Sequence, residues 1–213
     1  GNGATTVGIT PSALSPTTAD LLWTSEYGNA GKFNSLNLTV EYNDGYIYVT
    51  TPDTFVNGNA GVAAYNESDE IIWSWHLWLT GSDVESTAIK TSVGDFMDRN
   101  LGAYRNGNGS KSGDDIYASY GLYYQWGRTE PMPRPIDYSF TKNEDEYVYN
   151  HLENFLRWKY VDAEDGAGSA EYAIANPMAF VLGSKSNDYD WLYSSHDDNL
   201  WSANSKSVND PCP

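Results

Sequence analysis

The most apolar stretch of the chain is residues 71–80, which reads IIWSWHLWLT and holds three of the eight tryptophans. It is too short to cross a bilayer, which takes about 20 apolar residues. Its β-branched and aromatic residues favour a strand, in which alternate side chains point to opposite faces. We therefore predict a central strand of a sheet. One of its faces is wholly apolar and is expected to be buried, with Ile71, Trp73, Trp75, Leu77 and Leu79 on it.

The opposite face of this strand mixes polar atoms with one indole. It carries Ile72, Ser74, His76, Trp78 and Thr80. Such a face is either a second, tighter interface or a half-wet groove. A buried histidine satisfied by a backbone carbonyl is the ordinary fate of a residue like His76. The alternative is a sugar-binding platform, which needs an exposed indole such as Trp78 beside hydrogen-bonding groups.

The composition bounds the class of protein. The chain has 213 residues, enough for one large domain or two small ones, and its formal charge is −17. That charge repels phosphate groups, so nucleic acid and anionic membrane surfaces are poor partners, and no membrane insertion is expected. No cofactor is expected. A structural calcium ion is an open alternative, although the acidic runs at 67–70, 143–146 and 162–165 lack the ligand spacing of an EF-hand.

Cys212 is the one cysteine, so no disulfide can form within the chain and no cysteine-based metal cluster exists. Neither a signal peptide nor a transmembrane segment is recognisable. Gly1 before Asn2 is typical of an expression remnant, so the sequence itself says little about location.

The chain before residue 91 reads as β structure. Residues 1–20 are expected to be a linker or lead-in strand, and residues 21–90 a β-rich module. Alternating apolar residues at 36–42, then Asn43-Asp44-Gly45, predict a hairpin whose return strand is 46–51. A short strand at 62–65 follows, and 66–70 is a polar turn. We predict an antiparallel meander of about five strands between residues 21 and 80.

The character of the sequence changes after this module. Leu122 and Trp126 are four residues apart and Gly127 follows, which predicts a short helix over 118–126 with Leu122 in its core. The spacing of apolar residues predicts a second helix over 146–158, and 169–174 reads as a strand.

A series of motifs now stands in order along the chain. They are residues 71–80, 97–103 (MDRNLGA), 121–128 (GLYYQWGR), 174–177 (IANP), 190–191 (DW), 200–201 (LW) and 210–213 (DPCP). The series resembles Bacteroidetes surface proteins with a "Fibrobacter succinogenes major paralogous" (FISUMP) domain, which are associated with fimbrillin-like modules and described as cell-adhesion proteins.

The resemblance covers roughly residues 58–213 and implies export, a place at the cell surface or outer membrane, and lipoprotein anchoring of the intact protein. It also implies a C-type-lectin-like fold, similar to that of formylglycine-generating enzymes, in a module at 91–213. The family's segment after Asp-Pro-Cys-Pro is absent, so this module is expected to be truncated. The fold class expected overall is mainly β (α+β), an N-terminal antiparallel sheet or sandwich followed by this lectin-like module with one or two short helices.

Candidate site residues come from the mixed face and from the second motif group. Trp73, Trp75 and Leu77 are interpreted as core, because aromatic and aliphatic side chains dominate β cores. Arg128 is expected to form a structural ion pair or a hydrogen bond, and Asp98 and Arg99 to fix a turn. The candidate ligand-binding residues are His76, Trp78, Tyr124, Trp126 and Arg128.

Nothing in the sequence singles out a catalytic group. Ser194, Ser195, His196 and Asp197 have the residue types of a triad, but adjacency in one loop is poor support for triad geometry. The oxidase chemistry of formylglycine-generating enzymes needs paired cysteines. The function expected is a non-catalytic cell-surface adhesion or fimbria-associated binding module for a glycan or protein. The alternatives are a glycan-processing enzyme or accessory subunit, and a pilus subunit that assembles by strand exchange.

Overall fold

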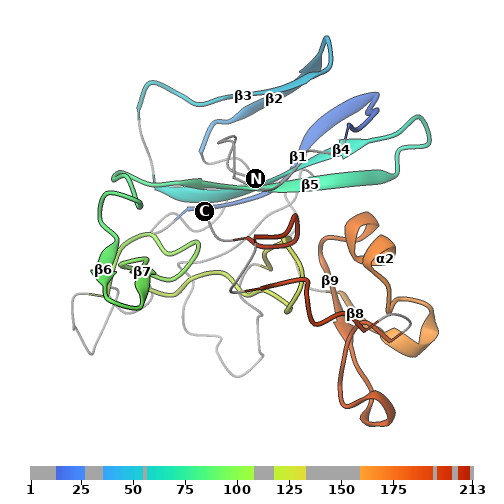
Figure 1. The fold of residues 1–213 in the computed structure, drawn as a ribbon. Coiled ribbons are helices and arrows are strands. Elements are labelled where there is room, and N and C mark those ends of the chain that lie inside the picture. The colour runs from blue at the N-terminus through green and yellow to red at the C-terminus, as the bar shows by residue number, and fades with distance from the viewer. Residues whose placement is uncertain are drawn as a thin grey trace, which may run out of the picture.

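The computed structural model describes residues 13–26, 36–54, 57–107, 118–132, 159–193, 196–202 and 206–211. In these parts the chain is mainly β, as predicted, with little helix (Figure 1). The strands of the first half are β1 (Thr18–Glu26), β2 (Thr39–Asn43), β3 (Tyr46–Thr50), β4 (Gly58–Tyr65), β5 (Ile71–Leu79), β6 (Ile89–Thr91) and β7 (Gly94–Phe96). The second half contributes β8 (Lys159–Asp162), β9 (Ala179–Leu182), the helix α2 (Ala170–Ala175) and the 3-10 turns η2 (Ala163–Asp165) and η3 (Lys185–Asn187).

The sheet that organises the first half is antiparallel and has the order β1-β4-β5. The tryptophan-rich stretch is a strand, as predicted, but the prediction of a central strand was wrong because β5 lies at the edge and β4 in the middle. The sequence of β4, GNAGVAAY, consists mainly of small residues, and all but Tyr65 are buried. A Cβ on Gly61 would come within 2.3 Å of the indole of Trp23. Small residues in β4 let other parts of the chain approach both of its faces.

The apolar face of β5, which was expected to be buried, is buried only in part. Trp73, Trp75 and Leu77 are only partly buried, and the one buried residue of this strand is Ser74. Leu77 packs with Leu79 against the hydrophobic cluster formed by Leu21, Leu36, Leu38, Ala60 and Val62. The hydrophobic cluster therefore covers this face at the C-terminal half of β5. An edge strand has a neighbour on one side only, so its large side chains keep part of their surface in water.

Strands β2 and β3 form the predicted hairpin. Asn43 pairs with Tyr46, and the two residues between them, Asp44 and Gly45, have φ of 48° and 82°. Positive φ at both positions is the geometry of the tight two-residue turn that Asp-Gly favours. The hairpin does not continue a meander, however, because β1 pairs with β4. It forms a second layer, and Figure 1 shows it on one side of the sheet with the chain after β5 on the other.

Three further expectations concern local structure. Residues 18–20 belong to β1, which agrees with the lead-in strand of the two alternatives for residues 1–20. The strand predicted at 169–174 is the helix α2, in which the side chain of Ser169 accepts a hydrogen bond of 3.1 Å from the backbone N–H of Tyr172. That side-chain cap stabilises the first turn, and the β reading of the sequence missed it. The helix predicted at 146–158 lies outside the described residues.

The helix predicted over 118–126 does not form. Tyr123 instead pairs with Met132 in an isolated antiparallel bridge, through N–H···O bonds of 3.0 and 2.7 Å. A Cβ on Gly121 would lie 2.4 Å from the carbonyl oxygen of Leu101, so the chain here runs close against another segment. Leu122 is partly buried and lies over Gly102, where its side chain occupies the space of a Cβ. Tertiary contacts have overridden the helical spacing.

The C-terminal part has its own small core. Strands β8 and β9 pair in parallel. Ala163, Ala167, Ala173, Val181, Trp191 and Leu192 are buried together, and α2 lies beside β5. No helix in the described part of the chain has the length and hydropathy needed to cross a membrane.

Candidate functional site

The structure separates the predicted site residues into two groups. His76 and Trp78 on the sheet are hydrogen-bonded to Tyr124 and Ala103, respectively, whereas Trp126 and Arg128 lie near the C-terminal core. The face of the sheet that His76 and Trp78 share also carries Trp23, Asn59 and Gly61, because these residues are cross-strand partners.

A chain of hydrogen bonds runs through the first group. The amide Nδ2 of Asn59 donates to the carbonyl oxygen of Gly102 at 3.0 Å, which turns its Oδ1 toward His76 Nε2 at 2.9 Å. His76 Nε2 therefore carries the proton, and His76 Nδ1 accepts from the hydroxyl of Tyr124 at 3.0 Å. The partners of His76 are thus two side chains instead of the expected backbone carbonyl. The sequence gives no sign of them, since Asn59 and Tyr124 lie 17 and 48 residues away.

The imidazole of His76 is neutral in this setting. Its ring stacks on that of Trp23, with centroids 6.3 Å apart and planes at 24°. Burial lowers the pKa of His76 from 6.5 to about 3, because the charged form loses its hydration. A neutral ring with one donor and one acceptor matches the two partners that it has. His76 therefore stabilises the contact between the sheet and Tyr124.

Two more hydrogen bonds cross the same boundary. The indole Nε1 of Trp78 donates to the carbonyl oxygen of Ala103 at 3.0 Å. The hydroxyl of Tyr104 donates to Ser25 Oγ at 2.8 Å in a buried position. Of the two alternatives for the mixed face of β5, the structure thus shows the tight interface. His76, Trp78 and Tyr124 direct their polar atoms into it and not toward solvent.

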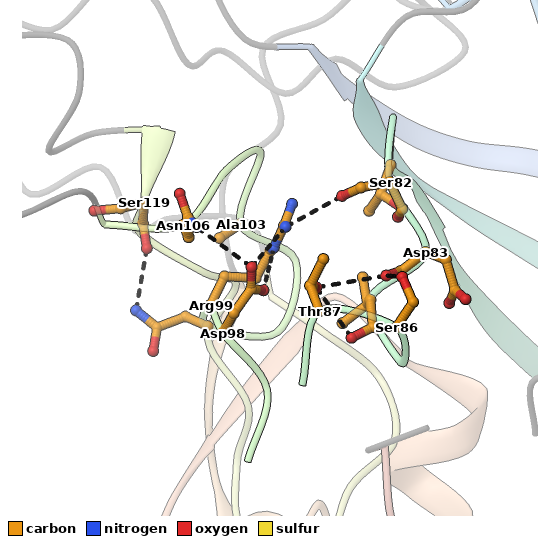
Figure 2. Close-up of polar contacts among 12 residues, drawn as sticks. Ser82, Asp83, Ser86, Thr87, Asp98, Arg99, Ala103, Asn106 and Ser119 are labelled. Carbon is orange, nitrogen blue, oxygen red and sulfur yellow. Dashed lines mark hydrogen bonds and ion pairs between the residues drawn. The ribbon is translucent and has the colours of Figure 1, made fainter. Parts of the chain in front are cut away.

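A polar cluster joins the loop after β5 to residues 98–106 (Figure 2). Arg99 donates twice to the carboxylate of Asp98, at 2.7 and 3.0 Å, and once to Ser82 Oγ at 3.2 Å. Asn106 Nδ2 also donates to Asp98, at 3.3 Å. The hydrogen bond from Arg99 is the main reason why the pKa of Asp98 lies below its ordinary value. These contacts fix the turn, which is the role predicted for Asp98 and Arg99.

Arg128 is the centre of the second group. Its side chain is buried and pairs with Glu130 at 3.1 Å, which confirms the expected structural ion pair. The guanidinium also donates to Gln125 Oε1 at 2.9 Å and to the carbonyl oxygen of Ala179 at 2.8 Å. Burial lowers the pKa of Arg128, and Glu130 opposes that effect. With these partners, Arg128 joins residues 125–130 to β9.

Gln125 strengthens the same connection. Its side-chain amide donates to the carbonyl oxygen of Val181 at 2.8 Å and accepts from the N–H of Val181 at 2.9 Å, as a neighbouring strand would. Sequence reasoning noted Glu130 beside Arg128 but missed Gln125 and Trp191. The signal that could have drawn attention to Gln125 is a polar residue close to a charged pair, Arg128 and Glu130.

Trp126 presents an exposed indole above this buried framework. Its side chain is 40% exposed, and its ring packs at 6.2 Å and 51° against that of Trp201. Trp201 is itself held by a hydrogen bond of 2.6 Å from its Nε1 to the carbonyl oxygen of Asn209. Gly127 follows with a φ of 82°, and a Cβ there would meet Leu200 at 2.6 Å. The sharp turn at Gly127 holds the Trp126 backbone close to residues 200–201.

His196 is exposed and lies between two carboxylates. His196 Nδ1 lies 2.5 Å from Asp190 Oδ2, and its Nε2 lies 3.0 Å from Asp198 Oδ1. The hydrogen bond to Asp190 is the main cause of a raised pKa for His196.

Ser194 and Ser195 lie outside the described residues, as does Cys212. Among the described residues, no group of three or more His, Cys, Asp or Glu side chains is arranged to hold a metal ion, and calcium binding stays a prediction.

Comparison with models of known protein families, with curated proteins and with solved structures finds no match to this chain.

Proposed function

We propose that the chain is a non-catalytic binding module of a cell-surface adhesion or fimbria-associated protein, and that it recognises its partner through Trp126. The observation that carries this proposal is an exposed indole on a rigid support. Exposing a large aromatic ring forgoes the free energy gained by burying it. The ring of Trp126 nevertheless packs on Trp201, and its backbone carbonyl oxygen accepts a hydrogen bond from the indole Nε1–H of Trp191.

The partner that suits this surface is a neutral glycan or a protein surface of similar chemistry. Apolar C–H faces of sugars pack on aromatic rings, while their hydroxyl groups take hydrogen bonds from polar groups nearby. Asn199, Ser202, Ser207 and Asn209, which are close to Trp201 in the sequence, supply asparagine and serine side chains. The formal charge of −17 opposes anionic ligands, so neutral ones are favoured. A pre-positioned ring also loses little conformational entropy on binding.

Export and lipoprotein anchoring of the intact protein belong to the same proposal. Their support is the ordered motif series that resembles FISUMP-type proteins. Fractionation of the source cells, with an antibody against this chain, tests the location separately from ligand binding.

The experiment is a glycan array combined with capture of surface proteins, run with wild type, Trp126→Ala and a matched control. Phe96→Ala is the control, because Phe96 is also an exposed aromatic residue, on the separate hairpin β6–β7. We expect specific binding by wild type and Phe96→Ala and its loss in Trp126→Ala. Absence of any specific partner, or equal binding by all three proteins, contradicts the proposal.

A second candidate function, assembly by strand exchange, has one observation in its favour. β5 is nine residues long and lies at an edge of its sheet, and Trp73 and Trp75 are only partly buried. A long, apolar edge strand is a template for pairing with another strand. Light scattering over a range of concentrations tests it: self-association that Trp73→Lys abolishes supports this function, and a monomer at all concentrations contradicts it.

A further inference from the structure

The outer face of the hairpin β2–β3 carries two exposed tyrosines beside a carboxylate. Tyr46 is 67% exposed and Tyr48 is 50% exposed, and their ring centroids are 6.3 Å apart with planes at 53°. Glu41 is the cross-strand partner of Tyr48, and Asn43 is that of Tyr46. Because cross-strand partners share a face, all four side chains project outward from the same small surface. We call Glu41, Asn43, Tyr46 and Tyr48 the outer tyrosine face.

This face is held in a fixed position by the other side of the hairpin. Val40, Ile47 and Val49 are partly buried and pack against the cluster beneath them. The turn at Asp44 and Gly45 sets the register of the two strands. The tyrosine rings are therefore presented on a rigid support, as a binding surface requires, and they lie on a different layer from Trp126.

The sequence around this face is strongly acidic. Between residues 33 and 89 there is no lysine or arginine, and the acidic residues there are Glu41, Asp44, Asp53, Glu67, Asp69, Glu70, Asp83 and Glu85. The hairpin and the sheet beneath it thus create a negative potential that attracts cations and repels anions. An aromatic face attracts a cation as well, through the negative electrostatic potential of its ring.

We propose that the outer tyrosine face docks an extended segment of a protein partner with lysine or arginine at alternate positions. In an extended chain, alternate side chains share a face and lie about 6.6–6.8 Å apart. That spacing matches the 6.3 Å between the two rings, so each ring receives one cation. Glu41 pairs with the cation over Tyr48. This surface is separate from Trp126, and the inference does not depend on the function proposed there.

The test uses synthetic peptides, tyrosine variants that leave the charge unchanged, and Glu41→Gln, which removes one negative charge. The probe is a soluble peptide with lysine at every second position, and the comparison peptide has the same composition with its lysines in one block. Isothermal titration at low salt compares wild type, Tyr46→Ser/Tyr48→Ser and Tyr46→Phe/Tyr48→Phe. Tyr189→Ser is the matched control, because Tyr189 is exposed and lies outside the hairpin. Circular dichroism and urea unfolding show that each variant is folded.

We expect the alternating peptide to bind more tightly than the block peptide. The double serine variant should bind about ten-fold more weakly, since each exposed cation–ring contact contributes a factor of about 2–5. The double phenylalanine variant and Tyr189→Ser should keep the wild-type affinity, and Glu41→Gln should lose several-fold. Equal affinity for both peptides, unchanged binding by the serine variant, or loss of binding by the phenylalanine variant each overturns the proposal. The last result would point instead to hydroxyl contacts, as a glycan would make.

Discussion

The indole Nε1–H of Trp191 donates a hydrogen bond of 2.7 Å to the backbone carbonyl oxygen of Trp126. Trp191 is buried, and the guanidinium of Arg128 lies 5.6 Å from the centre of its ring. Trp191 thus supports the backbone of Trp126, and the buried guanidinium of Arg128 supports Trp191. The exposed ring of Trp126 is therefore coupled to the packing of Arg128.

Replacing Arg128 by methionine should destabilise the fold strongly. The change leaves the carboxylate of Glu130 buried without its cation, and removing one partner of a buried ion pair costs about 3–5 kcal/mol. It also leaves Gln125 Oε1 and the carbonyl oxygen of Ala179 without a donor from Arg128. Urea unfolding followed by fluorescence measures the loss of unfolding free energy.

The double variant Arg128→Met/Glu130→Gln separates the two causes of this loss. Neutralising Glu130 removes the unpaired charge, so the double variant should be more stable than Arg128→Met alone. A double variant as unstable as the single one would show that the buried charge is not the source of the cost.

Replacing Tyr124 by phenylalanine should lower stability by about 1–3 kcal/mol. The change removes the hydroxyl that donates to His76 Nδ1 and leaves a partly buried acceptor unsatisfied. Tyr48→Phe is the control, because Tyr48 is exposed on the outer face of β3 and should tolerate the change. Thermal and urea unfolding check the difference, and equal stabilities of the two variants would contradict the role of this hydrogen bond.

Stability should fall as the pH drops below 6.5, because of His76. The folded protein holds the pKa of His76 at about 3, whereas the unfolded chain takes up the proton near pH 6.5. Between these values the unfolded state binds more protons, so the unfolding free energy rises with pH by at most about 1.4 kcal/mol per unit. The full contribution is present above pH 6.5 and is lost as the pH falls toward 3.

The window from pH 6.5 to 5 separates this effect from that of most carboxylates, which titrate mainly below it. His76→Gln should flatten the dependence of the unfolding free energy on pH in that window. His196 acts in the opposite sense, since its pKa is raised by Asp190 and its contribution is lost as the pH rises. His196→Asn is therefore measured beside it, and a slope that survives in His76→Gln argues against a neutral, buried His76.

Replacing Gly61 by alanine should cost about 1–3 kcal/mol. The new Cβ would lie 2.3 Å from the ring of Trp23, which is buried and cannot swing away without disturbing His76. Gly107→Ala is the control, because a Cβ there meets Ser119 at an ordinary distance of 3.7 Å. Chemical denaturation of both variants is the measurement. A stable Gly61→Ala would mean that Trp23 does not lie across β4.

Some local signals in this sequence predicted local structure correctly, whereas those at 118–126 and 169–174 did not. The Asp44–Gly45 turn, the strand at β5 and the polar turn at 66–70 follow from a few neighbouring residues. The position of β5 in the sheet does not, because it depends on which segment pairs with β4. The small residues of β4 are the signal for a strand that is covered on both faces. The large apolar residues of β5 instead suggested that β5 was the central strand.

The candidate site could be predicted only in part, because some of its contacts are local in the sequence and others are distant. Trp126 and Arg128 stand in a motif that can be read from the chain, and the ion pair between Arg128 and Glu130 spans two residues. The partners that decide the burial of Arg128 lie far away, with Ala179 at a separation of 51 residues. Residues 118–126 do not form the expected helix, because Gly121 packs closely against Leu101. No periodicity in residues 118–126 carries that information.

The most direct test of the central claim is the ratio of dissociation constants for Trp126→Ala and wild type, measured with the strongest ligand from the glycan array or the surface-protein capture. The account predicts at least about a ten-fold weakening for Trp126→Ala, which corresponds to at least about 1.4 kcal/mol, as expected for an aromatic anchor at an interface. It predicts no more than about a two-fold change for Phe96→Ala, an exposed aromatic residue away from this surface. Equal affinities of Trp126→Ala and wild type would contradict the claim that Trp126 is the binding surface.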